Sequence, residues 1–130
     1  MKKKLLCCIF VVPLFLNAQL LFENQADELG VGIAYGMGSL AGGISFYDYN
    51  QDGLDDLTMA SEFGEDFHFY KNIGGSFIED DLNLFGGNEK TRQITWVDYD
   101  NDGDLDFFTA SDNGLSRLFR NDGESIFVDV

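Results

Sequence analysis

Basic residues are scarce in this chain of 130 residues, which has 8 Lys and Arg against 23 Asp and Glu and a formal net charge of −15. A protein that binds duplex DNA or an anionic membrane needs a positive surface to neutralise phosphate groups, and this composition has the opposite sign. We therefore expect no nucleic-acid partner and no binding to an acidic lipid surface.

Histidine, cysteine and proline are also rare. The one histidine is His68, and the cysteines are Cys7 and Cys8. Because no nucleophile is placed to pair with it, we expect His68 to be an ordinary strand residue and the protein not to be an enzyme. A single Pro and 15 Gly favour tight turns between short strands over long helices.

Residues 1–18 have the pattern of a secretory signal peptide. Lys2 to Lys4 are followed by an apolar run of 12 residues, Leu5 to Leu16, which is too short to span about 30 Å of bilayer, and Ala18 precedes the expected cleavage point. Cleavage there leaves 5 basic and 23 acidic residues, a net charge of −18, and no cysteine. We expect a secreted or cell-surface protein without disulfides and without membrane insertion after signal removal.

The rest of the chain, residues 19–130, repeats one unit. The segment 44–57 aligns with the segment 94–107, 50 positions later. We place the units at about 22–76 and 77–126, with a third beginning at 127.

Each unit contains four short apolar runs separated by Gly-rich or Asn-Gly turns, which predicts antiparallel strands. We expect these strands at 44–47, 57–60, 67–71, 76–79, 94–97, 107–110, 116–120 and 126–130. Four strands in about 50 residues is the size of one β-propeller blade. The predicted fold is all-β, with about two blades of an incomplete propeller. Propellers usually close with about 4–8 blades, so we expect further blades, from a longer chain or from another chain.

Two acidic loops contain the candidate cation ligands. The windows 48–56 and 98–106 both carry Asp at positions 1, 5 and 9 and Gly at position 6, while position 3 is Asn50 in the first and Asp100 in the second. Alternate side chains of such a loop can turn carboxylates inward around a hard cation, while Gly permits the sharp turn and position 7 offers its backbone carbonyl. A solvated Asp-Gly hairpin is the alternative, but it does not explain agreement at every ligand position.

The spacing favours Ca²⁺ over other cations. An EF-hand needs a bidentate Glu at position 12 and flanking helices, whereas position 12 is Met59 in the first loop and Thr109 in the second. Mg²⁺ seldom uses cages made only of protein ligands, and Zn²⁺ lacks its Cys and His ligands here. The aromatic residues Phe46, Tyr47, Trp96 and Phe107, which flank the loops, are expected in the core between blades.

At these residues the sequence resembles the FG-GAP or VCBS repeat. The resemblance is carried by Phe46–Leu57, its copy Trp96–Phe107, and the segments Phe69–Gly74 and Leu118–Gly123. It covers roughly residues 20–130 and implies the propeller of integrin α chains and many secreted bacterial proteins. The signal peptide also resembles those of exported proteins that join such repeats to an ASPIC/UnbV module, related to cartilage acidic protein.

The resemblance implies two structural Ca²⁺ ions, one in each loop. The implied ligands are Asp48, Asn50, Asp52, the Leu54 carbonyl and Asp56 in the first loop, and Asp98, Asp100, Asp102, the Asp104 carbonyl and Asp106 in the second. Asn50 stands where Asp is usual, which predicts a weaker first site.

We expect an exported, non-enzymatic calcium-binding module that acts in extracellular or cell-surface binding or adhesion, with a protein or glycan ligand. An alternative is the non-catalytic accessory propeller of a larger secreted enzyme that acts on polysaccharide. A small soluble calcium buffer is the third, although extracellular calcium modules bind only at about 10⁻⁴–10⁻³ M.

Overall fold

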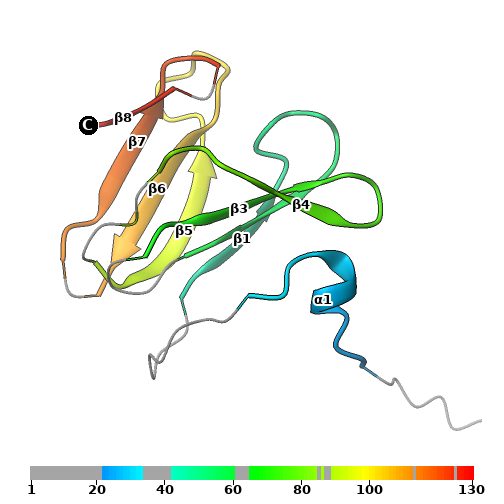
Figure 1. The fold of residues 1–130 in the computed structure, drawn as a ribbon. Helices are drawn as coiled ribbons and strands as arrows, with labels where there is room; N and C mark the ends of the chain where they lie inside the picture. The colour runs from blue at the N-terminus through cyan, green and yellow to red at the C-terminus, as the bar shows by residue number, and fades with distance from the viewer. Residues whose placement is uncertain are drawn as a thin grey trace, which may run out of the picture.

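The computed structural model describes residues 22–33, 42–60, 65–84, 86, 89–112, 114–124 and 126–130. The predicted signal peptide lies outside these residues. Within them the chain forms two four-stranded antiparallel sheets, each with its strands in chain order (Figure 1). This confirms the prediction of an all-β fold built from two blade-like units.

The first sheet contains β1 (Ile44–Tyr47), β2 (Asp56–Met59), β3 (His68–Asn72) and β4 (Phe77–Asp80). The second contains β5 (Thr91–Val97), β6 (Asp106–Ser111), β7 (Arg117–Asn121) and β8 (Phe127–Asp129). Each of the eight strands overlaps one of the eight predicted from the sequence.

The boundaries of the two sheets differ from the boundaries of the sequence units. β4 begins at Phe77, where the sequence places the start of the second unit, yet it pairs with β3 and closes the first sheet. β8 begins at Phe127, the start of the third unit, and closes the second sheet against β7. The hairpin turns therefore determine which strands belong together, and each sheet ends with the residues that open the next sequence unit.

A short helix, α1 (Ala26–Leu29), precedes the first sheet. It ends at Gly30, whose φ of 81° is left-handed. The Gly30 backbone also lies so close to Phe77 that a Cβ atom at Gly30 would be 2.5 Å from the Phe77 carbonyl oxygen. Glycine is therefore required where the helix meets β4. No helix among the described residues is long and apolar enough to cross a membrane.

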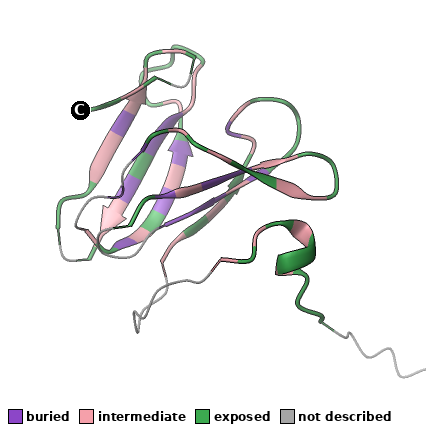
Figure 2. Cartoon of the chain, viewed as in Figure 1, coloured by how far each residue is buried: buried purple, intermediate pink, exposed green. Residues whose placement is uncertain are grey.

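The core lies between the two sheets, and buried positions concentrate on their strands (Figure 2). Its buried members are Tyr49, Ala60, Phe67, Phe69, Leu84, Ile94, Trp96, Phe107 and Phe119.

Trp96 lies at the centre of the contact between the sheets. Its ring stacks on Tyr49 with centroids 4.9 Å apart and meets Phe69 edge-on at 6.0 Å. Its Nε1 donates a hydrogen bond of 3.0 Å to Oγ1 of Thr58 on β2, in a buried environment. The Trp96 ring also contacts Phe107 at 5.0 Å. One side chain thus joins the sheets through both apolar packing and a satisfied buried N–H group.

Two of the four aromatic residues expected in this core lie elsewhere. Trp96 and Phe107 are buried, but Phe46 is 58% exposed and Tyr47 is 47% exposed. The Thr58 side chain faces the second sheet, and so does that of Ser45, which pairs with it. Because side chains alternate along a strand, the next residue, Phe46, faces away from the second sheet.

The stacking of the sheets explains the contrast between Phe46 and Trp96, which occupy equivalent positions. The two sheets stack in the same sense, so the face that carries Trp96 in the second sheet meets the first sheet. The equivalent face of the first sheet, which carries Phe46 and the nearby Phe77 ring at 6.2 Å, points away from the second sheet. Tyr47 lies at the end of β1, and its counterpart Val97 at the end of β5 is also exposed.

Substitution of the two adjacent phenylalanines of β6 tests this packing. We expect Phe107→Ala to lower the free energy of unfolding by about 3–5 kcal/mol because its fully buried ring contacts both sheets. Phe108→Ala is the matched control, since its side chain points to the opposite face, and its cost should be about 1 kcal/mol or less. Urea denaturation measures both, and equal losses would contradict the arrangement.

Candidate metal centre

The two acidic loops join β1 to β2 and β5 to β6, and they have left-handed backbone at the same two positions. Gly53 and Gly103, at the sixth position, have φ of 92° and 98°. Gln51 and Asn101, at the fourth, have φ of 58° and 61°. The turn expected at Gly is present, and the left-handed residue at the fourth position is a feature that the sequence analysis missed. Asn101 was the one sequence signal for this left-handed backbone, because Asn adopts the left-handed conformation more readily than most residues.

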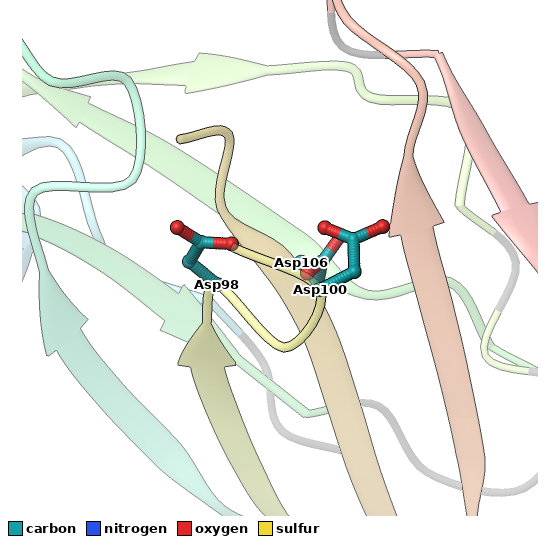
Figure 3. Close-up of side chains that lie close together, drawn as sticks. All are labelled: Asp98, Asp100 and Asp106. Carbon is teal, nitrogen blue, oxygen red and sulfur yellow. The ribbon is translucent and has the colours of Figure 1, made fainter. Parts of the chain in front are cut away.

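Three carboxylates converge in the second loop. Asp98 follows β5, Asp100 lies in the loop and Asp106 opens β6, and one oxygen from each lies within 4.8 Å of the others (Figure 3). The Oδ1 atom of Asp98 is buried and has no hydrogen-bond partner. Desolvation, together with the negative charges of Asp102 and Asp106, raises the pKa of Asp100. Such a cluster is electrostatically unfavourable unless a cation offsets its charge.

Asp106 is held by two backbone donors, one within the loop and one on β7. It is fully buried, and its oxygens accept hydrogen bonds of 2.8 Å from the Tyr99 N–H and 2.9 Å from the Asn121 N–H. Two N–H donors compensate part of the cost of burying this carboxylate. The ninth position is therefore rigid in the second loop.

The carboxylate of Asp102 does not join this cluster. Asp102 Oδ1 instead accepts a hydrogen bond of 2.9 Å from the Asp104 N–H. The carboxylate of Asp102 and the carbonyl of Asp104 stay predicted ligands.

In the first loop, three of the predicted ligands accept hydrogen bonds from backbone N–H groups of the same loop. Asp48 accepts hydrogen bonds from the Asp52 and Gly53 N–H groups, both at 2.9 Å, and the Asn50 side chain accepts a second bond of 2.9 Å from the Asp52 N–H. The Asp52 carboxylate accepts from the Leu54 N–H at 2.9 Å. These bonds turn the first, third and fifth side chains of the loop inward. The Leu54 carbonyl stays a predicted ligand.

Asp56, the ninth residue of the first loop, is fully buried, and only one of its two carboxylate oxygens has a hydrogen-bond partner. Its Oδ1 accepts a hydrogen bond of 2.8 Å from the Asn72 N–H, whereas its buried Oδ2 has no partner. Burial raises the pKa of Asp56, and the hydrogen bond from Asn72 opposes this effect. A buried carboxylate oxygen that lacks a donor fits a cation ligand at this position.

Asn72 on β3 clamps the end of the first loop. Besides its backbone bond to Asp56, its Nδ2 donates to the Asp55 carbonyl at 2.9 Å and its Oδ1 accepts from the Gly74 N–H at 2.9 Å. The sequence analysis assigned this Asn-x-Gly segment only to a turn. The available signal was the similar separation of this Asn from the last residue of the acidic loop, 16 positions in the first copy and 15 in the second.

The second copy repeats the clamp bond for bond. The Asn121 N–H donates to Asp106 at 2.9 Å, its Nδ2 donates to the Leu105 carbonyl at 3.3 Å, and its Oδ1 accepts from the Gly123 N–H at 3.1 Å. Each candidate site is therefore built from one loop and the third strand of the same sheet.

Removal of the clamp side chain should destabilise the protein without touching a predicted ligand. We expect Asn72→Ala to lower the free energy of unfolding by about 1–2 kcal/mol, because it removes two hydrogen bonds at the end of the loop. Ile73→Ala, at the adjacent exposed position, is the control and should cost about 0.5 kcal/mol or less. Thermal and urea unfolding measure both variants. An Asn72→Ala variant as stable as the wild type would show that the clamp has no structural role.

Comparison with known proteins adds one family. Residues 48–109 match the family model described as an FG-GAP-like repeat, a span that runs from the first residue of the first acidic loop into β6. A search of curated proteins gave no match. The family model does not name a subgroup, so the resemblance to the ASPIC/UnbV group stays a prediction. The match includes both acidic loops and agrees with the repeated sheets, so residues 48–109 are similar to an FG-GAP-like repeat.

Proposed function

We propose that this protein is an exported calcium-binding β-propeller repeat module that acts in extracellular or cell-surface binding, with one structural Ca²⁺ in each acidic loop. The observation that carries the proposal is the convergence of Asp98, Asp100 and Asp106 around a buried carboxylate oxygen without a partner. These are the first, third and ninth positions, where the loop spacing predicts ligands.

The donor set suits a hard divalent cation. All side-chain donors at the predicted positions are carboxylate or amide oxygens, and Ca²⁺ takes about 6–8 oxygen ligands, waters included. Asp100 is exposed, so solvent can reach this side of the cluster and supply part of the shell. In the first loop Asn50 replaces the second carboxylate of the cluster, which supports a weaker site there.

Ion pairs elsewhere in the molecule account for several other acidic residues. Among the residues that the structure describes, ion pairs join Lys or Arg to aspartates outside both loops, namely Lys71–Asp80, Arg92–Asp112, Arg117–Asp129 and Arg120–Asp122. These basic side chains compensate carboxylates on strands and turns. A bound cation would supply the corresponding charge inside the loops.

The binding role rests on the signal-peptide pattern, the repeat family and the absence of a catalytic constellation in the sequence. We propose an extracellular protein or glycan as ligand and further blades as structural neighbours. The exposure of Phe46 supports such neighbours, since it lies on the face equivalent to the one that Trp96 buries. The accessory propeller of a larger polysaccharide-acting enzyme is the alternative, and the same exposed face is compatible with it.

Calcium titration by isothermal calorimetry tests the metal sites. We expect two ions per chain in the wild type and one in Asp98→Asn, because that substitution removes a carboxylate of the second cluster. Asp55→Asn is the control, since Asp55 is exposed and occupies the eighth position, where no ligand is expected. At free Ca²⁺ ten times Kd, each site should add about 1.4 kcal/mol to the free energy of unfolding. A wild-type protein that takes up no calcium would refute the proposal.

The buried carboxylate at position 56 gives a second test, in which the sign of the effect depends on calcium. In EDTA we expect Asp56→Asn to stabilise the protein, because the amide keeps an acceptor for the Asn72 N–H and removes a poorly compensated buried charge. In excess Ca²⁺ the same variant should be less stable than the wild type, because it loses a charged ligand. Thermal unfolding in both buffers measures the reversal, with Asp55→Asn as the control. A variant that is destabilised equally in both buffers would indicate a purely structural role for Asp56.

A further inference from the structure

The two acidic loops contact each other, although they belong to different sheets. The Gln51 side chain, at the fourth position of the first loop, donates through Nε2 to the backbone carbonyl of Gly103, at the sixth position of the second, over 2.8 Å. The two residues are 52 positions apart. The candidate sites are therefore neighbours joined by a direct hydrogen bond.

The donor of this bond is oriented by predicted ligands of the first loop. The Gln51 backbone is left-handed, with φ of 58°, and the next N–H, that of Asp52, donates to both Asp48 and Asn50. The peptide group that follows Gln51 is therefore held by these two predicted ligands.

The acceptor is equally close to the second cluster. Gly103, whose carbonyl receives the Gln51 bond, donates its own N–H to Asp98 Oδ2 at 3.2 Å. Asp98 is one of the three converging carboxylates. Two hydrogen bonds, joined through the backbone of Gly103, thus connect the Gln51 side chain of the first loop to the cluster of the second.

An apolar contact reinforces the link at the base of the loops. Tyr49, the second residue of the first loop, stacks on Trp96 at 4.9 Å with an interplanar angle of 16°. Both rings are buried, and Trp96 lies on β5 two positions before Asp98. Tyr49 also donates its hydroxyl to Asp80 Oδ2 at 3.1 Å, which fixes the ring to β4.

We propose that Gln51 is a positioning residue for the second site and that it couples the two sites, so that a cation in either loop raises the affinity of the other. This inference rests on the proposed function. Ion binding restricts a loop at a cost in conformational entropy, and a loop already held by its neighbour incurs less of that cost. The coupling is reciprocal, so each loop favours binding at the other by the same factor.

The chain provides a matched control at the equivalent position of the second loop. Asn101 has the same left-handed backbone, with φ of 61°, and a side chain one methylene shorter. Within the described residues, no hydrogen bond joins the Asn101 side chain to the first loop. Substitution of Asn101 therefore removes an amide side chain from the same left-handed backbone setting without removing the contact between loops.

The experiment is a calorimetric calcium titration of the full chain, in which one loop is disabled and the affinity of the other is measured. Asp98→Asn with Asp100→Asn disables the second loop. We expect this change to weaken calcium binding at the first loop by about fivefold or more. In the presence of Gln51→Met, which preserves side-chain length but cannot donate, disabling the second loop should alter the first-loop affinity less than about twofold. Asn101→Ala should retain the full coupling.

The outcomes separate the coupling from the metal sites themselves. A wild type that binds two ions independently would overturn the coupling and leave the proposed function intact, whereas a wild type that binds none would refute both. Coupling unchanged in Gln51→Met, or lost equally in Asn101→Ala, would overturn the role of Gln51. Near-ultraviolet circular dichroism of the stacked Tyr49 and Trp96 checks that every variant keeps the contact between the sheets, so loss of coupling with this signal intact supports the role.

Discussion

The buried carboxylates of Asp56 and Asp106 determine the geometry of both acidic loops. Each opens the second strand of its sheet, is fully excluded from solvent, and is held by a backbone N–H from the neighbouring third strand, at Asn72 or Asn121. A buried carboxylate needs donors or a cation, so the sheet itself fixes where the ninth loop residue lies. The preceding eight residues must then close between a fixed strand end and a fixed carboxylate. This constraint accounts for the left-handed turns and for the inward side chains.

The second level of organisation is the contact between the sheets. The Trp96 side chain satisfies its N–H on Thr58 and stacks on Tyr49, which is itself part of the first acidic loop. The Tyr49 ring therefore belongs to the core and also lies next to a candidate metal centre. Packing between the sheets and loop geometry are for this reason not independent, and a change at one is transmitted a short distance to the other.

The sequence was sufficient for features that repeat within one unit. Strand number, antiparallel pairing and the turn at Gly53 follow from local spacing, since each depends on residues close in the chain. Features that depend on how two units meet were missed. The exposure of Phe46 depends on the direction in which the sheets stack, and the bond from Gln51 to Gly103 joins residues of different units. The Asn72 clamp lies between these cases, because its distance along the chain from the acidic loop recurs to within one residue in the second copy but its bonds to the loop require the folded hairpin.

The common direction of the two sheets also makes their contact heterologous. The face of the first sheet that meets the second carries Thr58 and Phe69, and the equivalent face of the second sheet, with Phe108 and Leu118, points outward. Units joined in this way have unlike ends, so a two-fold axis cannot complete the interface. Such a series closes only when the rotation between neighbours divides a full circle, and otherwise it continues as a helix. The angle between adjacent sheets, across which Trp96 packs, is therefore the quantity that decides how many units complete a ring.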